Sequence, residues 1–179
     1  MGTFYFYLWF YWALKVTLNS LLTAAVFSLI MTFFLYIQQG AIDLTSEVID
    51  ALLDIAIFWF PIFWSFVLLI VLFRSVKYIF ENCFDGYKFE LLSCNKTEVI
   101  SSIGYGDLVK VWRKWFMLLI WLSAIEMIFA LVFTKVFTSY ESLFEWFNIY
   151  ILYTFILIAG YISFIVIASK CRQIRISMC

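Results

Sequence analysis

The sequence predicts an all-α membrane protein with four transmembrane helices, and three observations lead to that class. Of the 179 residues, 66% are hydrophobic and only 13% are charged. A soluble domain is typically about half apolar and about a quarter charged, and a small one leaves much of its surface in water. The apolar residues also gather in four stretches, each long enough to cross a hydrocarbon core of about 30 Å. Basic residues flank these stretches unevenly, which is typical of an oriented membrane protein.

The four spans follow from the lengths of the apolar stretches, because a spanning helix needs about 20 mostly apolar residues. They are predicted at about residues 17–37, 51–73, 115–137 and 143–169, within a single domain of residues 1–179. Ser142 and Glu145 match a capping box, Ser-x-x-Glu, which opens the fourth span. Pro61 lies in the middle of the second span, where it lacks an amide donor and is expected to kink the helix.

The apolar residues before the first span are predicted to form a separate helix. Residues 4–14 joined to the first span would make a helix of about 50 Å at about 1.5 Å per residue, which is too long for the core. We therefore expect residues 4–14 to lie in the cytoplasmic interface, a depth that suits their Tyr and Trp side chains. Lys15 would then reach the headgroups. One long, tilted helix is the alternative.

The basic residues predict the side of the membrane on which each loop lies. They gather in residues 74–114 and in the tail, as Arg74, Lys77, Lys88, Lys96, Lys110, Arg113, Lys114, Lys170, Arg172 and Arg175. The connection between the first two spans contains acidic residues and no Lys or Arg. The positive-inside rule therefore predicts a protein of the cell inner (plasma) membrane whose loop 74–114 and both termini are cytoplasmic.

The cytoplasmic loop is predicted to contain a small subdomain. Residues 87–91 alternate apolar and polar side chains, as a strand does. Asn95 and Lys96 are expected to turn the chain, and residues 97–103 to return as a second strand. A small β-hairpin under the membrane is the resulting prediction.

The chemistry-bearing residues argue against an enzyme. The sequence has no histidine, which excludes His-based acid–base catalysis, Ser-His-Asp and Cys-His arrangements and the common zinc sites. No metal and no cofactor is therefore predicted, and a formal net charge of zero gives no bulk attraction to nucleic acid. The four cysteines are Cys83, Cys94, Cys171 and Cys179. They lie in segments predicted to be cytoplasmic, where thiols stay reduced, and they are expected to be free.

Residues 102–108, Ser-Ile-Gly-Tyr-Gly-Asp-Leu, resemble the selectivity filter of potassium channels, Thr-Val-Gly-Tyr-Gly-Asp. In those channels glycines let successive backbone carbonyls face the pore. The resemblance implies a filter-like turn at Gly104, Tyr105, Gly106 and Asp107. Polar residues before the motif, its predicted cytoplasmic side and basic residues after it depart from a channel filter. A glycine turn leading into the third span is the competing interpretation.

Glu126 lies near the middle of the third predicted span. An ionised carboxylate is costly at the centre of a bilayer, and no Lys or Arg lies at a comparable depth in another span. Its expected partners are hydroxyl groups, backbone freed near Pro61, water, or Glu126 of neighbouring subunits. Two interpretations follow: a water-lined cavity, proton site or pore constriction, or a protonated carboxyl group that holds helices together.

Small residues indicate where helices approach closely. Ser20, Ala24 and Ser28 recur every four positions in the first span. They are expected to let this helix pack tightly against another, either within the chain or in a second copy. Gly160, beside Ala159 and near Ser163, is expected to do the same in the fourth span. Most Phe, Trp and Tyr side chains are expected to serve as lipid-facing anchors and packing.

These features favour a non-enzymatic membrane subunit that self-associates and holds, or signals to, a cytoplasmic protein through residues 74–114. Its plan of four spans and one cytoplasmic loop is similar to that of small membrane subunits of bacterial anti-phage defence systems such as Kiwa. The likeness implies a role in such a system or in a similar accessory system. The alternative is an oligomeric ion channel with Glu126 or the Gly104-Tyr105-Gly106 motif in the conduction path.

Overall fold

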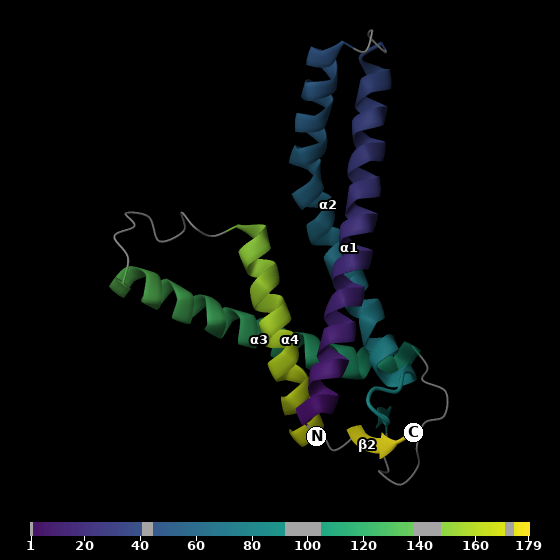
Figure 1. Ribbon diagram of the computed structural model, residues 1–179, viewed down its shortest axis with the longest axis vertical. Coiled ribbons are helices and arrows are strands. Elements are labelled where there is room, and N and C mark those ends of the chain that lie inside the picture. Colours follow the sequence, from purple (N-terminus) through teal and green to yellow (C-terminus); the bar gives the residue numbers. More distant parts are fainter. Residues whose placement is uncertain (1, 41–44, 92–104, 138–147, 171–173) are drawn as a thin grey trace. The chain divides into compact units, whose positions relative to one another are not determined.

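A computed structural model shows four helices and two short strands in the residues that it describes (Figure 1). The described residues are 2–40, 45–91, 105–137, 148–170 and 174–179. The elements are α1 (Gly2–Gln38), α2 (Ser46–Glu81), β1 (Tyr87–Leu91), α3 (Tyr105–Phe137), α4 (Ile149–Lys170) and β2 (Ile174–Met178). All four helices are long and apolar enough to cross a membrane, which confirms the predicted class.

Helix α1 corrects the prediction of a separate helix at residues 4–14. It runs unbroken from Gly2 to Gln38 over 37 residues, which is the long-helix alternative. The side chains near its N-terminal end are buried within the protein and do not form an exposed interfacial face: Phe4, Leu8 and Trp12 are at most 2% exposed. The helix continues because these aromatic and aliphatic side chains have a protein core to pack against, while Lys15 stays exposed.

One face of α1 is buried along almost its whole length. Buried residues recur every four positions, as Phe4, Leu8, Trp12, Val16, Ser20, Ala24, Ser28 and Thr32. Four residues turn an α-helix by about 400°, so this stripe drifts around the axis by about 40° at each step. The two ends of the stripe therefore face different neighbours, and α1 contributes to both compact units of the chain.

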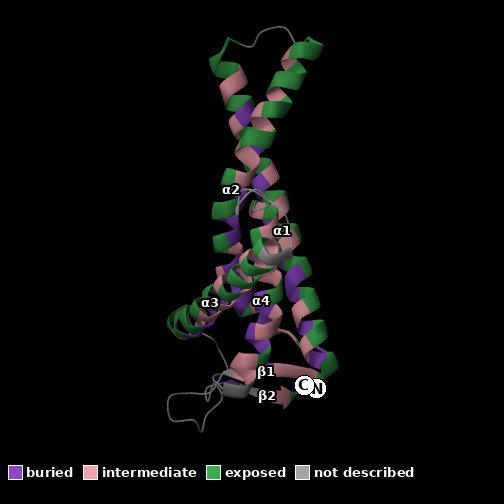
Figure 2. Cartoon of the chain, turned by 90° about the vertical axis from the view of Figure 1, so that its left-hand side faces the viewer, coloured by how far each residue is buried: buried purple, intermediate pink, exposed green. Residues whose placement is uncertain are grey.

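The first compact unit contains residues 14–75, that is, most of α1 and of α2. Buried residues alternate with exposed ones along both helices (Figure 2). Trp64 is 2% exposed, and its indole Nε1 donates to Ser20 Oγ at 3.0 Å. Helix α2 continues through Pro61, whose carbonyl oxygen accepts a hydrogen bond from Ser65 Oγ at 2.8 Å.

The second compact unit contains residues 1–13 and 76–179, and its β-sheet differs from the predicted hairpin. The strand predicted at residues 87–91 is confirmed as β1. Its partner is β2 from the tail, antiparallel, with Tyr87 opposite Met178 and Leu91 opposite Ile174. Residues 97–103, the predicted partner, lie outside the described residues. The tail residues 174–178 also alternate apolar and polar side chains, so a strand signal was present there.

Helix α4 begins at Ile149, later than the predicted start at residue 143. Asn148 caps it, because its Oδ1 accepts hydrogen bonds from the amides of Tyr150 and Ile151, both at 3.0 Å. The predicted capping residues Ser142 and Glu145 lie outside the described residues. Helix α4 packs against α3.

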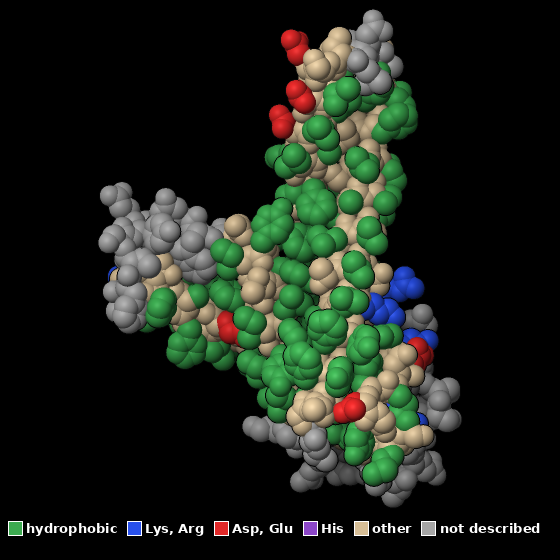
Figure 3. Space-filling view, viewed as in Figure 1, with side chains coloured by type: hydrophobic (Ala, Val, Ile, Leu, Met, Phe, Trp, Pro, Cys, Tyr) green, Lys and Arg blue, Asp and Glu red, His purple; other side chains and the backbone are tan. Residues whose placement is uncertain are grey.

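The helix surfaces suit a lipid environment. Hydrophobic side chains cover most of the visible faces of the helices (Figure 3). Large apolar residues such as Phe66, Trp121 and Phe129 are at least 66% exposed, which would be costly in water. The acidic residues Glu47, Asp50 and Asp54 are exposed in the first turns of α2, whereas the basic Arg74 lies near the other end of that helix.

Candidate functional site

The candidate site is the carboxyl group of Glu126, near the middle of α3. Both carboxyl oxygens of Glu126 are buried, and neither has a hydrogen-bond partner among the residues that the structure describes. The hydroxyl of Ser123 is buried and unpartnered in the same way. Ser123 and Glu126 are three residues apart, so they lie on neighbouring positions of one helix face.

Two unsatisfied polar groups in one helical turn are energetically unfavourable. A charged side chain at the centre of a spanning helix costs about 2.5–3.5 kcal/mol on insertion scales. A neutral carboxyl group avoids much of that cost, but it still carries one donor and an acceptor that need partners. Neither the Lys77–Glu81 nor the Lys88–Glu90 ion pair involves Glu126.

Helix α3 leaves most of its apolar span uncovered by the rest of the chain. It is the least buried of the four candidate spans. Figure 1 shows α3 and α4 crossing within their lengths and diverging beyond the crossing. The exposed apolar residues Ile125, Ile128 and Phe129 surround the level of Glu126. The helix with the orphaned carboxyl group is thus also the candidate span with the smallest buried share.

Two tryptophan–serine hydrogen bonds hold the helices together, and sequence analysis missed both. Besides the bond from Trp64 to Ser20 in the first unit, Trp115 Nε1 donates to Ser163 Oγ at 2.8 Å. Ser163 Oγ in turn donates to the carbonyl of Gly160 at 2.7 Å. A buried indole needs an acceptor, so serines in apolar helices were the available signal. The tryptophans divide into buried ones like these and exposed ones such as Trp121.

The small-residue stripe lies on the buried face of α1. Ser20 and Ala24 have no exposed surface, and Ser28 is 2% exposed. Ser28 Oγ donates to the carbonyl of Ala56 on α2 at 2.5 Å. These residues therefore contribute to contact between helices of one chain. Gly160 allows another close approach, because a Cβ atom there would lie 2.6 Å from Cζ3 of Trp12.

The filter-like motif lies at the start of α3. Tyr105, Gly106 and Asp107 belong to the first turn of this helix, and Gly104 lies outside the described residues. A helical backbone directs its carbonyls along the axis into the next turn, whereas a filter needs carbonyls that face a pore. Among the described residues, no group of His, Cys, Asp or Glu could hold a metal ion.

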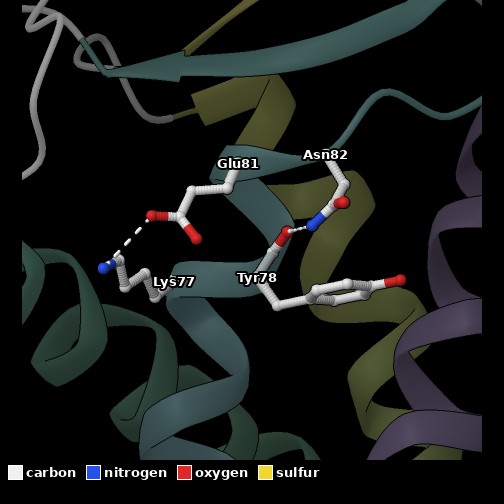
Figure 4. Close-up of polar contacts among 4 residues, drawn as sticks. All are labelled: Lys77, Tyr78, Glu81 and Asn82. Carbon is white, nitrogen blue, oxygen red and sulfur yellow. Dashed lines mark hydrogen bonds and ion pairs between the residues drawn. The ribbon is translucent and has the colours of Figure 1, made fainter.

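Two local polar contacts stabilise the end of α2. Asn82 Nδ2 donates to the carbonyl of Tyr78 at 2.8 Å and so satisfies a carbonyl of the last turn (Figure 4). Lys77 and Glu81 form an ion pair at 3.2 Å on the same turn. On β1, Phe89 is buried beside Phe4, whereas Lys88 pairs with Glu90 at 3.1 Å.

A disulfide corrects the expectation that all four cysteines are free. Cys83, two residues after α2, is bonded to Cys179, directly after β2. The sequence separation is 96 residues, and the Cα atoms are 6.3 Å apart. Sequence analysis missed this pair because nothing local indicated that β2 returns to β1. Cys94 and Cys171 lie outside the described residues.

Comparison of the chain with known protein families, curated proteins and solved structures found no match.

Proposed function

We propose that the chain is a non-enzymatic, multi-pass subunit of the cell inner membrane that self-associates through α3 and docks a cytoplasmic protein at its basic end. The observation that carries self-association is the orphaned carboxyl group of Glu126 on the least buried helix. A neutral carboxyl group is self-complementary, because its donor and acceptor match those of an identical group. A second copy related by a twofold axis would satisfy both carboxyl groups at once.

Variants of Glu126 test this association. Glu126→Gln keeps one donor group and one acceptor, so it should associate like the wild type. Glu126→Leu removes both and should weaken the dimer by about 1–2 kcal/mol, or roughly 5- to 30-fold in Kd, as expected for polar contacts between spanning helices. The measurement is energy transfer between labelled copies in liposomes as a function of protein-to-lipid ratio.

The exposed Glu47, at the start of α2, provides the matched control. Glu47→Gln should leave the association unchanged, because this carboxyl group lies outside the apolar part of the helix. Equal dissociation constants for wild type and Glu126→Leu would refute the association surface. Helical circular dichroism of each variant distinguishes a lost contact from a lost fold.

The cytoplasmic orientation and the protein partner are proposed from charge. Basic residues lie near the end of α2, on β1 and at the start of α3, including Arg74, Lys88 and Lys110, and the positive-inside rule directs such an end inward. The outward side chains of β1 are an ion pair, whereas Phe89 is buried, so the sheet offers a polar face to a partner. Cross-linking from the native host should recover a soluble protein with the wild type and less of it with Lys88→Glu.

The likeness in plan to small membrane subunits of anti-phage defence systems supports a role in such a system. With neighbouring genes present, phage plating should fall for wild type and recover for Glu126→Leu, if association is required. Plating that is unaffected by the wild-type protein would contradict this setting.

An ion-conducting pore is the second candidate, and the same unpartnered carboxyl group favours it, because a water-filled path would also hydrate Glu126. Liposomes that contain the protein should then release potassium, and Glu126→Gln should change the rate. If the protein associates but no potassium is released, the pore is excluded and the self-associating subunit remains.

A further inference from the structure

We infer that Cys83 and Cys179 form a reversible thiol–disulfide site that closes the β1–β2 sheet, and that its co-reactants are small cytoplasmic thiols and disulfides of the glutathione type. This inference rests on the cytoplasmic orientation proposed above. It adds a control point to the end of the chain where the partner is proposed to dock.

The disulfide lies at one end of the strand ladder. The last pair of the register is Tyr87 with Met178, and Cys179 follows immediately. The amide of Cys179 donates to the carbonyl of Gly86 at 3.0 Å, which extends the ladder toward the disulfide. Cys83 reaches the same place from the end of α2.

A tight turn brings β1 back beside Cys83. Phe84 and Tyr87 exchange two backbone hydrogen bonds, at 2.7 and 2.9 Å. Asp85 and Gly86 have φ angles of 52° and 77°, a left-handed conformation that glycine adopts readily. The turn therefore fixes the position of Cys83 relative to the start of β1.

The sheet needs the covalent link because little else selects its partner strand. It has two strands of five residues, a size that is marginal in water. No short turn connects β1 to β2, so closing the ladder loses the chain entropy of a long loop. A cross-link removes much of that entropy from the open state. Without it, the burial of Phe89 and Ile174 and the hydrogen bonds of a short ladder oppose release of the strand.

The location of the two cysteines permits exchange. Both residues are exposed, in contrast to the buried Phe84 and Phe89 beside them. An exposed disulfide can be attacked by a small thiolate, whereas a buried one is protected. In the cytoplasm the glutathione pool favours the dithiol, so the bond forms when that pool becomes oxidising.

The reaction balances as two successive exchanges. The Cys83 thiolate attacks a glutathione disulfide, forms a mixed disulfide and releases one glutathione thiolate. The Cys179 thiolate then attacks the Cys83 sulfur and releases the second glutathione. The protein dithiol loses two electrons and two protons, and one glutathione disulfide gains them as two glutathiones. Reduction reverses both steps and frees β2 from its covalent tether.

The experiment uses the full chain in lipid nanodiscs with Cys94→Ser and Cys171→Ser, so that only the paired cysteines report. The protein is equilibrated in glutathione buffers from reducing to oxidising, and free thiols are counted by the gel shift of a maleimide polymer. Two thiols should be labelled at the reducing end and none at the oxidising end. Hydrogen exchange at β1 and β2 should be at least about tenfold faster in the reduced protein, whereas exchange in the interior of α4 should not change.

Four results would overturn the inference. Thiols that stay reduced in every buffer, or β1–β2 hydrogen exchange that is the same in both states, would contradict the reversible disulfide but not the proposed orientation. In intact cells, labelling of these thiols by a membrane-impermeant reagent would show that Cys83 and Cys179 face outward. That result would contradict both the proposed orientation and the reversible disulfide. In oxidising buffer, Cys83→Ser should speed hydrogen exchange at the β1 and β2 amides as reduction does. Amides that stay protected in that variant would also contradict the role of the disulfide.

Discussion

At the residue scale, Trp115 and Ser163 join α3 to α4 through one hydrogen bond, from the indole Nε1 to the hydroxyl at 2.8 Å. Trp115 is 2% exposed and Ser163 has no exposed surface, so water cannot replace either partner. The bond therefore contributes more through the cost of losing it than through its own net strength. The Trp64–Ser20 bond has the same character in the other unit.

Ser163→Ala should destabilise the protein by about 1–3 kcal/mol, because it leaves the buried indole N–H without an acceptor. The measurement is reversible unfolding in mixed micelles, followed by tryptophan fluorescence. Trp115→Phe should cost less in the Ser163→Ala background than in the wild type, since the donor that Ser163→Ala leaves unpaired is then removed as well. Fully additive losses would show that the two side chains are not coupled. Ser65→Ala, at an exposed serine, is the control with little expected effect.

Two glycines of the helices should respond to alanine in opposite directions. At Gly160 the added Cβ would meet Trp12 at 2.6 Å, and we expect a loss of about 1–3 kcal/mol from overpacking. At Gly106 nothing lies within 4 Å of the new atom. Gly106→Ala should therefore be neutral, or stabilising by up to about 1 kcal/mol through helix propensity. The same unfolding assay measures both, and equal effects would contradict the packing at Trp12.

At the element scale, local sequence patterns predicted the helices but not all of their ends. Apolar length alone located the four spans, since it depends on each segment separately. The start of α4 depends on which polar side chain meets its free amides, and Asn148 does so in the structure. The buried stripe of α1 was visible in part, as Ser20, Ala24 and Ser28. Its extension to Phe4 needed knowledge of the neighbours, because aromatic residues suit a lipid interface equally well.

Asn148→Ala should fray the first turn of α4. The side chain satisfies two backbone amides there, and loss of such a cap costs about 0.5–2 kcal/mol. Hydrogen exchange should become faster at Tyr150 and Ile151 and stay unchanged near Ser163. Asn19→Ala, at an exposed position within α1, should have no comparable effect. Unchanged exchange at Ile151 would contradict the cap.

At the scale of the whole molecule, charge distribution predicts how the chain crosses the membrane. Acidic residues occur at the start of α2, and basic residues occur at its end and near the sheet. Orientation of this kind is decided during insertion by Lys and Arg near the ends of spans. It is independent of whether copies associate, so it can be tested by itself.

Single cysteines in a chain without native cysteines should react on opposite sides. Glu47→Cys should be labelled by a membrane-impermeant maleimide added to intact cells, since Glu47 is exposed at the acidic end of α2. Lys88→Cys should be labelled only after the cells are opened. The reverse pattern would show that the positive-inside assignment is wrong for this chain.

The sequence by itself determined that the chain is a helical membrane protein. Hydrophobic length and flanking charge are properties of each segment and of the solvent around it, so they need no knowledge of other segments. It also singled out Glu126, since a carboxyl group within an apolar stretch stands out without any neighbour. Only the tertiary structure decided that β1 pairs with β2 and that Cys83 meets Cys179, 96 residues away. Such partners are selected by packing and loop closure, which no local pattern of residues encodes.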